Sequence, residues 1–165
     1  MITPFSTAYD VKSYGDLFRL KLRLQQVDDR LLFRIGKGIW ESCGKVQECN
    51  LFCNGWECVD GSVVKGEDSL QGALREAKEE VGVDLLPEKG QVILSDIKKI
   101  EFGKVVNKIV DVWLFEYDGE VDLGNATTDE VAQVAWMNRE QIKELFDANM
   151  FVDTLEYFFT EVDKK

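Results

Sequence analysis

The stretch that most constrains this chain is residues 61–83, which read GSVVKGEDSLQGALREAKEEVGV. Its second half predicts a helix from Ser69 to Val81, because Asp68 or Ser69 can cap the start and Gly82 favours a stop. One face of this helix is apolar at spacings of three and four residues, which predicts burial against a core. That face consists of Leu70, Ala73, Leu74, Ala77 and Val81.

The other face of the same helix carries Glu76, Glu79 and Glu80 at i, i+3 and i+4, within an arc of about 100°. Each like-charged neighbouring pair costs roughly 0.2–0.5 kcal/mol on an exposed helix. Arg75 and Lys78 are the cations nearby in the sequence, and they do not offset all of this repulsion. A hard dication such as Mg²⁺ or Mn²⁺ would turn the cluster into a site, whereas a solvated acidic helix is the plain alternative.

The whole segment resembles the Nudix box, and the match lies on the expected loop and helix. The matching positions are Gly61, Glu67, Arg75, Glu76, Ala77, Glu79, Glu80, Gly82 and Val83. A match at so many fixed spacings is far more specific than a lone glycine motif. The resemblance implies a hydrolase that uses divalent metals to cut diphosphate linkages in nucleoside diphosphates joined to another moiety.

The resemblance also implies roles for individual residues. Glu76, Glu79 and Glu80 match the metal ligands of the family, Arg75 matches the arginine that orients a box glutamate, and Glu67 matches a mostly structural acid.

The chain departs from the family at Asp60-Gly61, where two glycines are usual and the first often lends its backbone carbonyl to metal. Asp60 keeps that carbonyl, although its Cβ restricts φ and ψ. The expected metal site, for Mg²⁺ or Mn²⁺, therefore comprises Asp60, Gly61, Glu76, Glu79 and Glu80.

A general base must be a carboxylate, because the chain contains no histidine. Glu76 or Glu130 could serve. In Nudix proteins an additional acid from beyond the box often joins the site, and Glu130 is the best candidate by position, just ahead of a predicted strand. A solvated loop acid is the competing interpretation of Glu130.

Composition limits the partners. The 165 residues predict a single domain of residues 1–165 with a core at about 17–160, and 45% apolar and 31% charged residues are typical of a soluble globular protein. A net charge of −11 without a basic run argues against long nucleic acids. With no apolar run of ~20 residues and no signal-like start, we expect a cytoplasmic protein away from membranes. A homodimer is left open.

Two residue types in the middle of the chain have alternative interpretations. For the four cysteines we expect free thiols, and a zinc site is the alternative. The four are Cys43, Cys49, Cys53 and Cys58. Trp40 or Trp56 could stack on a base, whereas covering the core is the simpler interpretation of each.

The remaining pattern predicts a mixed α/β sandwich. Alternation over residues 18–24, a turn at 28–29 and an apolar run at 30–35 predict a hairpin. Further strands are predicted at 91–102, 108–117 and 131–137, and helices at 139–149 and 151–162. The family resemblance implies the same architecture, a mixed sheet between helical layers.

Two functional hypotheses follow from the sequence. The first is hydrolysis of a diphosphate linkage in a nucleoside diphosphate derivative or a related small pyrophosphate. The second is a non-catalytic Nudix-fold module that binds a nucleotide metabolite; such proteins typically lose box glutamates, and this chain keeps them all. Residues 96–102 contain neither the proline nor the tyrosine that marks some substrate subgroups of the family.

Overall fold

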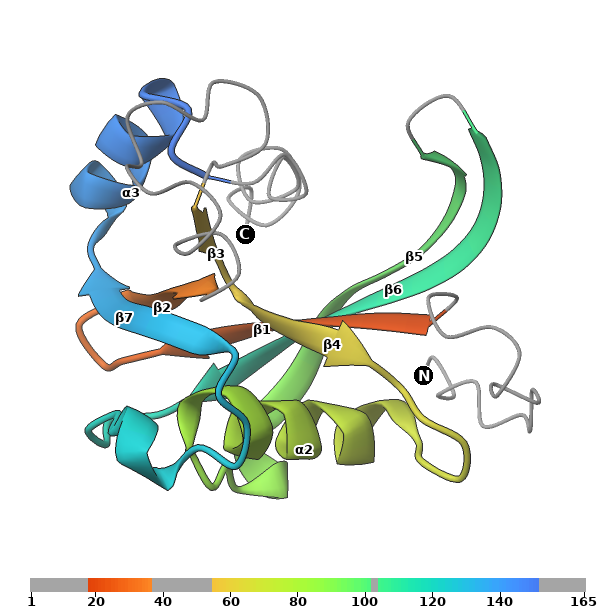
Figure 1. The fold of residues 1–165 in the computed structure, drawn as a ribbon, viewed down its shortest axis with the longest axis horizontal. Coiled ribbons are helices and arrows are strands. Elements are labelled where there is room, and N and C mark those ends of the chain that lie inside the picture. Colours follow the sequence, from red (N-terminus) through yellow and green to blue (C-terminus); the bar gives the residue numbers. More distant parts are fainter. Residues whose placement is uncertain (1–17, 37–54, 102–103, 152–165) are drawn as a thin grey trace.

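The chain folds around one mixed β-sheet with a helix on each face (Figure 1). The computed structural model describes residues 18–36, 55–101 and 104–151. Within these ranges the strands are β1 (Phe18–Gln25), β2 (Leu31–Gly36), β3 (Trp56–Glu57), β4 (Val59–Ser62), β5 (Gly90–Glu101), β6 (Lys104–Glu116) and β7 (Val131–Met137). The helices are α2 (Ser69–Val81), α3 (Arg139–Asp147) and the short 3-10 turns η2 (Pro87–Lys89) and η3 (Leu123–Asn125).

Strand β1 organises the sheet. The strand order is β3-β2-β1-β6-β5, with β4 paired to β1 and β7 paired to β2. The β1–β6 pair is parallel, while the other pairs are antiparallel, so the sheet is mixed as the sequence predicts. Within the described ranges no helix is both long enough and apolar enough to cross a membrane.

The predicted hairpin is confirmed at its turn, but its strands separate soon afterwards. The register of β1 against β2 contains the single pair Gln25↔Leu31. Beyond it, β1 pairs with β6 over its whole length and with β4 at residues 19–22, while β2 pairs with β7 and β3. This splaying lets β4, and the loop that leads from it to α2, lie beside β1.

Helix α2 begins and ends where the sequence predicts. Asp68 caps the start: its carboxylate accepts from the Gln71 amide at 2.8 Å, and the Gln71 side chain accepts from the Asp68 amide at 2.9 Å. Gly82 ends the helix in the left-handed region at φ 72°. A Cβ on Gly82 would also lie 2.7 Å from the Ala126 nitrogen, so the segment after η3 needs a glycine here.

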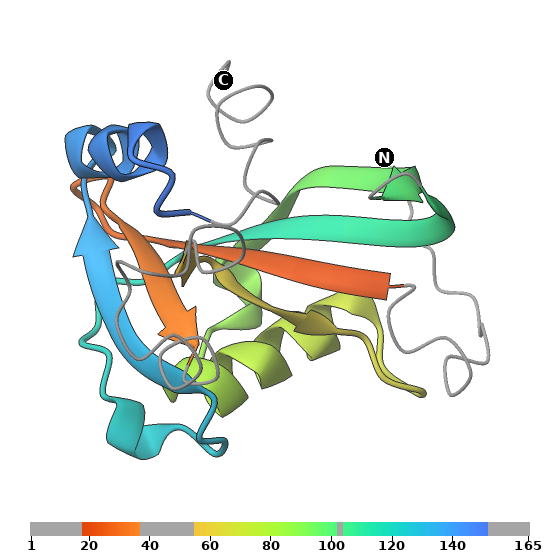
Figure 2. The same cartoon turned by 45° about the horizontal axis from the view of Figure 1, so that its top comes forward.

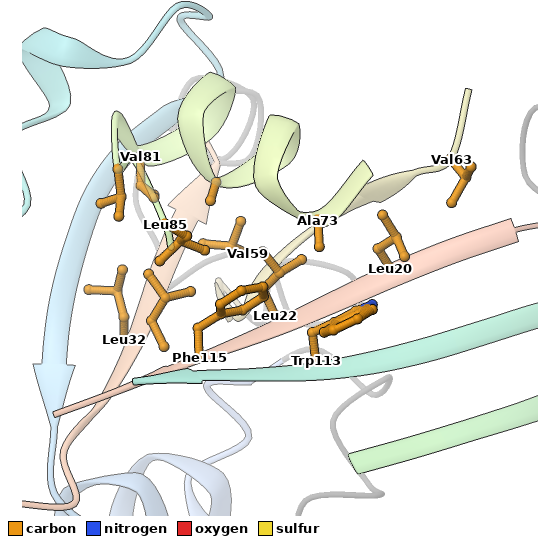
Figure 3. Packing of buried hydrophobic residues seen from close by; sticks show 13 residues of the cluster. Leu20, Leu22, Leu32, Val59, Val63, Ala73, Val81, Leu85, Trp113 and Phe115 are labelled. Atoms are coloured by element: carbon orange, nitrogen blue, oxygen red, sulfur yellow. The ribbon is translucent and has the colours of Figure 1, made fainter. Parts of the chain in front are cut away.

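The apolar face of α2 packs on β1, β4 and β6 (Figure 3). Ala73, Ala77 and Val81 are fully buried against alternate leucines of β1, among them Leu20. Each fully buried leucine contributes about 1.5–3 kcal/mol. Gly72 permits this close packing, because a Cβ there would lie 2.7 Å from the Leu20 Cδ1 atom.

A second apolar cluster lies on the other face of β2. Alternate residues of that strand pack with Ile142 of α3 and with Trp56 and Phe151. Figure 2 shows α2 and α3 on opposite sides of the sheet, which gives the predicted sandwich. Phe151 forms an isolated bridge with Trp56 and is not the start of the predicted helix, whose remainder at 152–162 lies outside the described residues.

Candidate active site

The acidic face of α2 is turned toward protein. Glu76 is 9% exposed and Glu80 only 4%, and the side chain of Glu79 is 34% exposed. Burying an ionised carboxylate is costly unless it is paired and hydrogen-bonded. The plain interpretation of a solvated helix face is therefore wrong for Glu76 and Glu80, and their burial requires partners.

Arg75 supplies one set of partners. Its Nε lies 2.6 Å from Glu67, and one terminal nitrogen donates to both Glu76 at 2.9 Å and Glu79 at 2.8 Å. The other terminal nitrogen donates to the Ser62 carbonyl at 2.7 Å. Hydrogen bonds to Glu67 raise the pKa of Arg75 against the effect of burial. Arg75 thus holds three carboxylates together and fixes the helix to the end of β4.

Gly61 lies directly beneath the Glu76 carboxyl group. A Cβ at position 61 would lie 1.9 Å from the Glu76 Cδ atom and 2.1 Å from its Oε1. The neighbouring Ser62 amide donates to the same Oε1 at 3.2 Å. Only glycine leaves room for this carboxyl group against the strand backbone. The structure therefore brings the Gly61 and Glu76 positions into contact.

Asp60 directs its carboxylate into a group of cations. It lies 2.9 Å from Arg19, 3.7 Å from Lys21 and 2.9 Å from Arg34. Burial alone would raise the pKa of Asp60, but Lys21, Arg19 and Arg34 together hold it below its ordinary value. The Asp60 side chain, which stands where the family usually has a glycine, is thus an anion paired with cations.

Glu80 pairs with a residue that sequence reasoning did not identify as part of the site. Arg34 of β2 places its Nε 2.5 Å from Glu80, and a terminal nitrogen donates to the other carboxylate oxygen at 3.1 Å. Arg34 is therefore a further cation at the acidic cluster, besides Arg75 and Lys78, which are nearby in the sequence. The sequence offers one signal for this role of Arg34: every other residue of its strand is apolar, apart from the glycine at the end. A cation in that position needs buried anions.

Burial dominates the electrostatics of the two most buried acids. It raises the pKa of Glu80 to about 8, with the negative charges of Asp60, Glu76 and Glu57 adding to the effect and Arg34 opposing it. Burial likewise raises the pKa of Glu76, against the hydrogen bond from Arg75. Both carboxyl groups are therefore harder to ionise than in water, and the arginine beside each opposes that effect.

The ion-paired network has too few cations for its acids. With every group ionised, the network has a charge of −2, because four cations face six carboxylates; the cations are Arg19, Lys21, Arg34 and Arg75, and the carboxylates are Glu57, Asp60, Glu67, Glu76, Glu79 and Glu80. Both the oxygen donors and the charge deficit fit a hard dication. Within the described residues, no three acids converge as a metal site while these arginines hold them. A dication at this site would compete with the arginines for the carboxylates.

The segment before β7 contacts the same helix. The Thr128 amide and hydroxyl both donate to the Glu79 carbonyl, at 3.1 and 2.9 Å. Two residues later, the Glu130 carbonyl lies 3.6 Å from the Cβ position of Gly36, at the end of β2. The Glu130 side chain is exposed, and among the described residues its carboxylate forms no ion pair with the cluster. Its predicted role as a base stays a prediction.

The tryptophans and cysteines considered from the sequence are not placed in this cluster by the described residues. Trp56 is 9% exposed and packs in the second apolar cluster, so it covers core. Cys58 is a buried free thiol, whereas Cys43, Cys49, Cys53 and Trp40 lie outside the described residues.

Comparisons with known proteins identify the same family as the Nudix-box motif. A family model described as a NUDIX domain matches residues 45–155. An uncharacterized Nudix hydrolase, lin0387, from Listeria innocua is 31% identical over 107 residues, which are 64% of this chain and 57% of that protein. The chain thus spans little more than half the length of this curated relative.

Solved structures share the fold. The E. coli dihydroneopterin triphosphate pyrophosphohydrolase has a TM-score of 0.58 at 17% identity, over 91% of this chain and 98% of that one. A C. elegans Ap4A hydrolase has a TM-score of 0.55 at 18% identity, over 90% and 96%. A Francisella tularensis bifunctional NMN adenylyltransferase/ADP ribose pyrophosphatase, complexed with AMP and a manganese ion, has a TM-score of 0.62 at 16% identity, over 90% and 41%.

Proposed function

Because this chain belongs to the Nudix family, we propose that it is a metal-dependent hydrolase of a diphosphate linkage in a nucleoside diphosphate derivative or related small pyrophosphate. The observation that supports this most strongly is the buried, incompletely neutralised set of carboxylates around α2. A solvated helix would not bury Glu76 and Glu80. We take residues 1–165 as one Nudix domain with its core at about 17–160.

Each residue of the set has a role in this proposal. Glu76, Glu79 and Glu80 bind Mg²⁺, or Mn²⁺ in its place, with help from the backbone at Asp60 and Gly61. When bound, the dication would withdraw charge from the phosphoryl group and lower the pKa of a bound water. Arg75 orients the Glu76 and Glu79 carboxylates, which it already holds from one nitrogen.

The proton from the attacking water goes to a carboxylate. Glu76 has a raised pKa from burial, which brings it closer to the range of an effective base. Glu130 is the other candidate, because its segment is anchored to α2 through Thr128. Water attack at one phosphorus would release a nucleoside monophosphate and a phosphorylated remainder. Most of the rate enhancement then comes from positioning and charge stabilisation.

The test is Mg²⁺-dependent release of phosphate or monophosphate across a panel of nucleoside diphosphate derivatives. Glu79→Gln should abolish turnover while the far-UV spectrum is retained, because the amide keeps the size of the side chain and removes its charge. Glu140→Gln, at an exposed position of α3, is the matched control and should be fully active. Full activity of the Glu79→Gln protein would refute the assignment.

The same panel separates the two hypotheses from the sequence. A non-catalytic binding module would bind a nucleotide metabolite with Mg²⁺ and release no product from any substrate. The retained box acids and their burial favour hydrolysis.

A further inference from the structure

We propose that Arg34 is an internal counter-ion that competes with the metal for Glu80, and that it thereby sets the metal affinity of the site. This inference rests on the proposed function, since it concerns how that site receives its dication. Arg34 is outside the box, on β2, and it reaches Glu80 across 46 residues of sequence.

The geometry of the pair shows direct competition. A terminal nitrogen of Arg34 donates to one oxygen of Glu80 at 3.1 Å, and the Arg34 Nε lies 2.5 Å from the other oxygen in an ion-pair contact that lacks hydrogen-bond geometry. The two side chains are only 8% and 4% exposed, so water offers little alternative solvation to either. A dication that binds Glu80 competes with Arg34 for the charge and the lone pairs of the same carboxylate.

Arg34 can release Glu80 without becoming an isolated buried charge. One terminal nitrogen lies 2.6 Å from Glu57 of β3, and the other lies 2.9 Å from Asp60 of β4. A guanidinium has five N–H groups in a fixed fork, so it can keep these two partners when the third leaves. Glu80 can therefore pass from the arginine to the metal at low energetic cost, because Glu57 and Asp60 still neutralise the guanidinium.

Arg75 and Arg19 are not equivalent to Arg34 in this respect. Arg75 pairs with Glu67, Glu76 and Glu79, and its side chain is 25% exposed. Arg19 donates to Asp60 at 2.9 Å and to Ser62 at 3.0 Å, and neither bond involves Glu80. Arg19 thus offers a matched control, a cation of the same network that pairs with Asp60 and leaves Glu80 to Arg34.

The experiment measures Mn²⁺ binding to the full chain without substrate, from the electron paramagnetic resonance signal of free Mn²⁺ in a titration with MnCl₂. Arg34→Met keeps most of the side-chain volume and removes the competitor, so Mn²⁺ should bind about tenfold tighter, or about 1.4 kcal/mol. Arg19→Gln should change the affinity by less than about threefold, since it removes a neighbouring charge without freeing Glu80. If the Arg34→Met protein does not fold, Arg34→Lys decides, because its point charge cannot engage both oxygens of Glu80 and should also tighten binding.

The outcomes separate this inference from the proposed function. Tighter binding in the Arg34 variant alone supports the competition. Equal tightening in the Arg34 and Arg19 variants would reduce the effect to general electrostatics and overturn the inference, as would weaker or unchanged binding in the Arg34 variant. In those cases the wild-type protein still binds Mn²⁺ and hydrolyses its substrate. A wild-type protein that binds no Mn²⁺ overturns both.

Discussion

Replacing Gly61 by alanine should disable the site while leaving the fold in place. The new Cβ would lie 1.9 Å from the Glu76 Cδ atom, whereas ordinary contact begins at 3.4 Å, so the carboxyl group must move by about 1.5 Å. That movement breaks the 3.2 Å hydrogen bond from the Ser62 amide and changes the approach of Arg75. A misplacement of about 1 Å costs about 10²-fold in rate, so we expect at least that loss in kcat/KM.

The stability cost should be modest, because overpacking by one methyl group costs about 1–3 kcal/mol. The assay pairs hydrolysis of a substrate from the panel with urea denaturation and Mn²⁺ titration of the same protein. Gly55→Ala is the matched control, since its Cβ would make ordinary contacts with Ile35 at 3.6–3.8 Å. A Gly61→Ala protein with wild-type kcat/KM and Mn²⁺ affinity would show that the position of the Glu76 carboxyl group does not matter.

Two further predictions concern the frame that holds the site. Gly82→Ala should destabilise the protein more than Gly66→Ala. Both glycines have a positive φ, 72° and 92°, so an alanine at either position costs about 1–2 kcal/mol in backbone strain. Only at position 82 would the new Cβ also meet a backbone atom, at 2.7 Å. Equal unfolding free energies in urea would contradict the packing of the 125–126 segment on the helix end. Leu22→Ala, at a fully buried position between α2 and the sheet, should cost about 2–5 kcal/mol, and a loss under about 1 kcal/mol in the same measurement would contradict the described core.

Local signals predicted the elements well because the determining residues are neighbours in sequence. Asp68, Gln71 and Gly82 fix the ends of α2 through bonds that span a few residues, and the helix has the predicted bounds. The predicted strand at 131–137 is likewise confirmed as β7, and α3 begins at the predicted residue, where Asn138 forms a capping box. Period-two alternation placed the leucines of β1 on the side that packs against α2.

Local sequence signals do not predict interactions between residues that are far apart in the chain. The parallel pairing of β1 with β6 joins residues about ninety apart, and alternation within β1 carries no information about its partner. Gly72 illustrates the same point, because the Leu20 side chain that a Cβ there would meet belongs to a strand about fifty residues earlier. In the site, the box identified the acids of α2, but the pairing of Glu80 with Arg34 depends on how β2 diverges from β1, which no local pattern encodes.

The proposed function depends on a dication bound by the acids of α2. The most direct measurement is an anomalous difference map from crystals of the full chain grown with MnCl₂. We expect a peak coordinated by carboxylate oxygens of Glu76, Glu79 and Glu80, with Glu80 no longer paired to Arg34. A map without a peak at these side chains, or with Mn²⁺ bound only elsewhere on the protein, would contradict it.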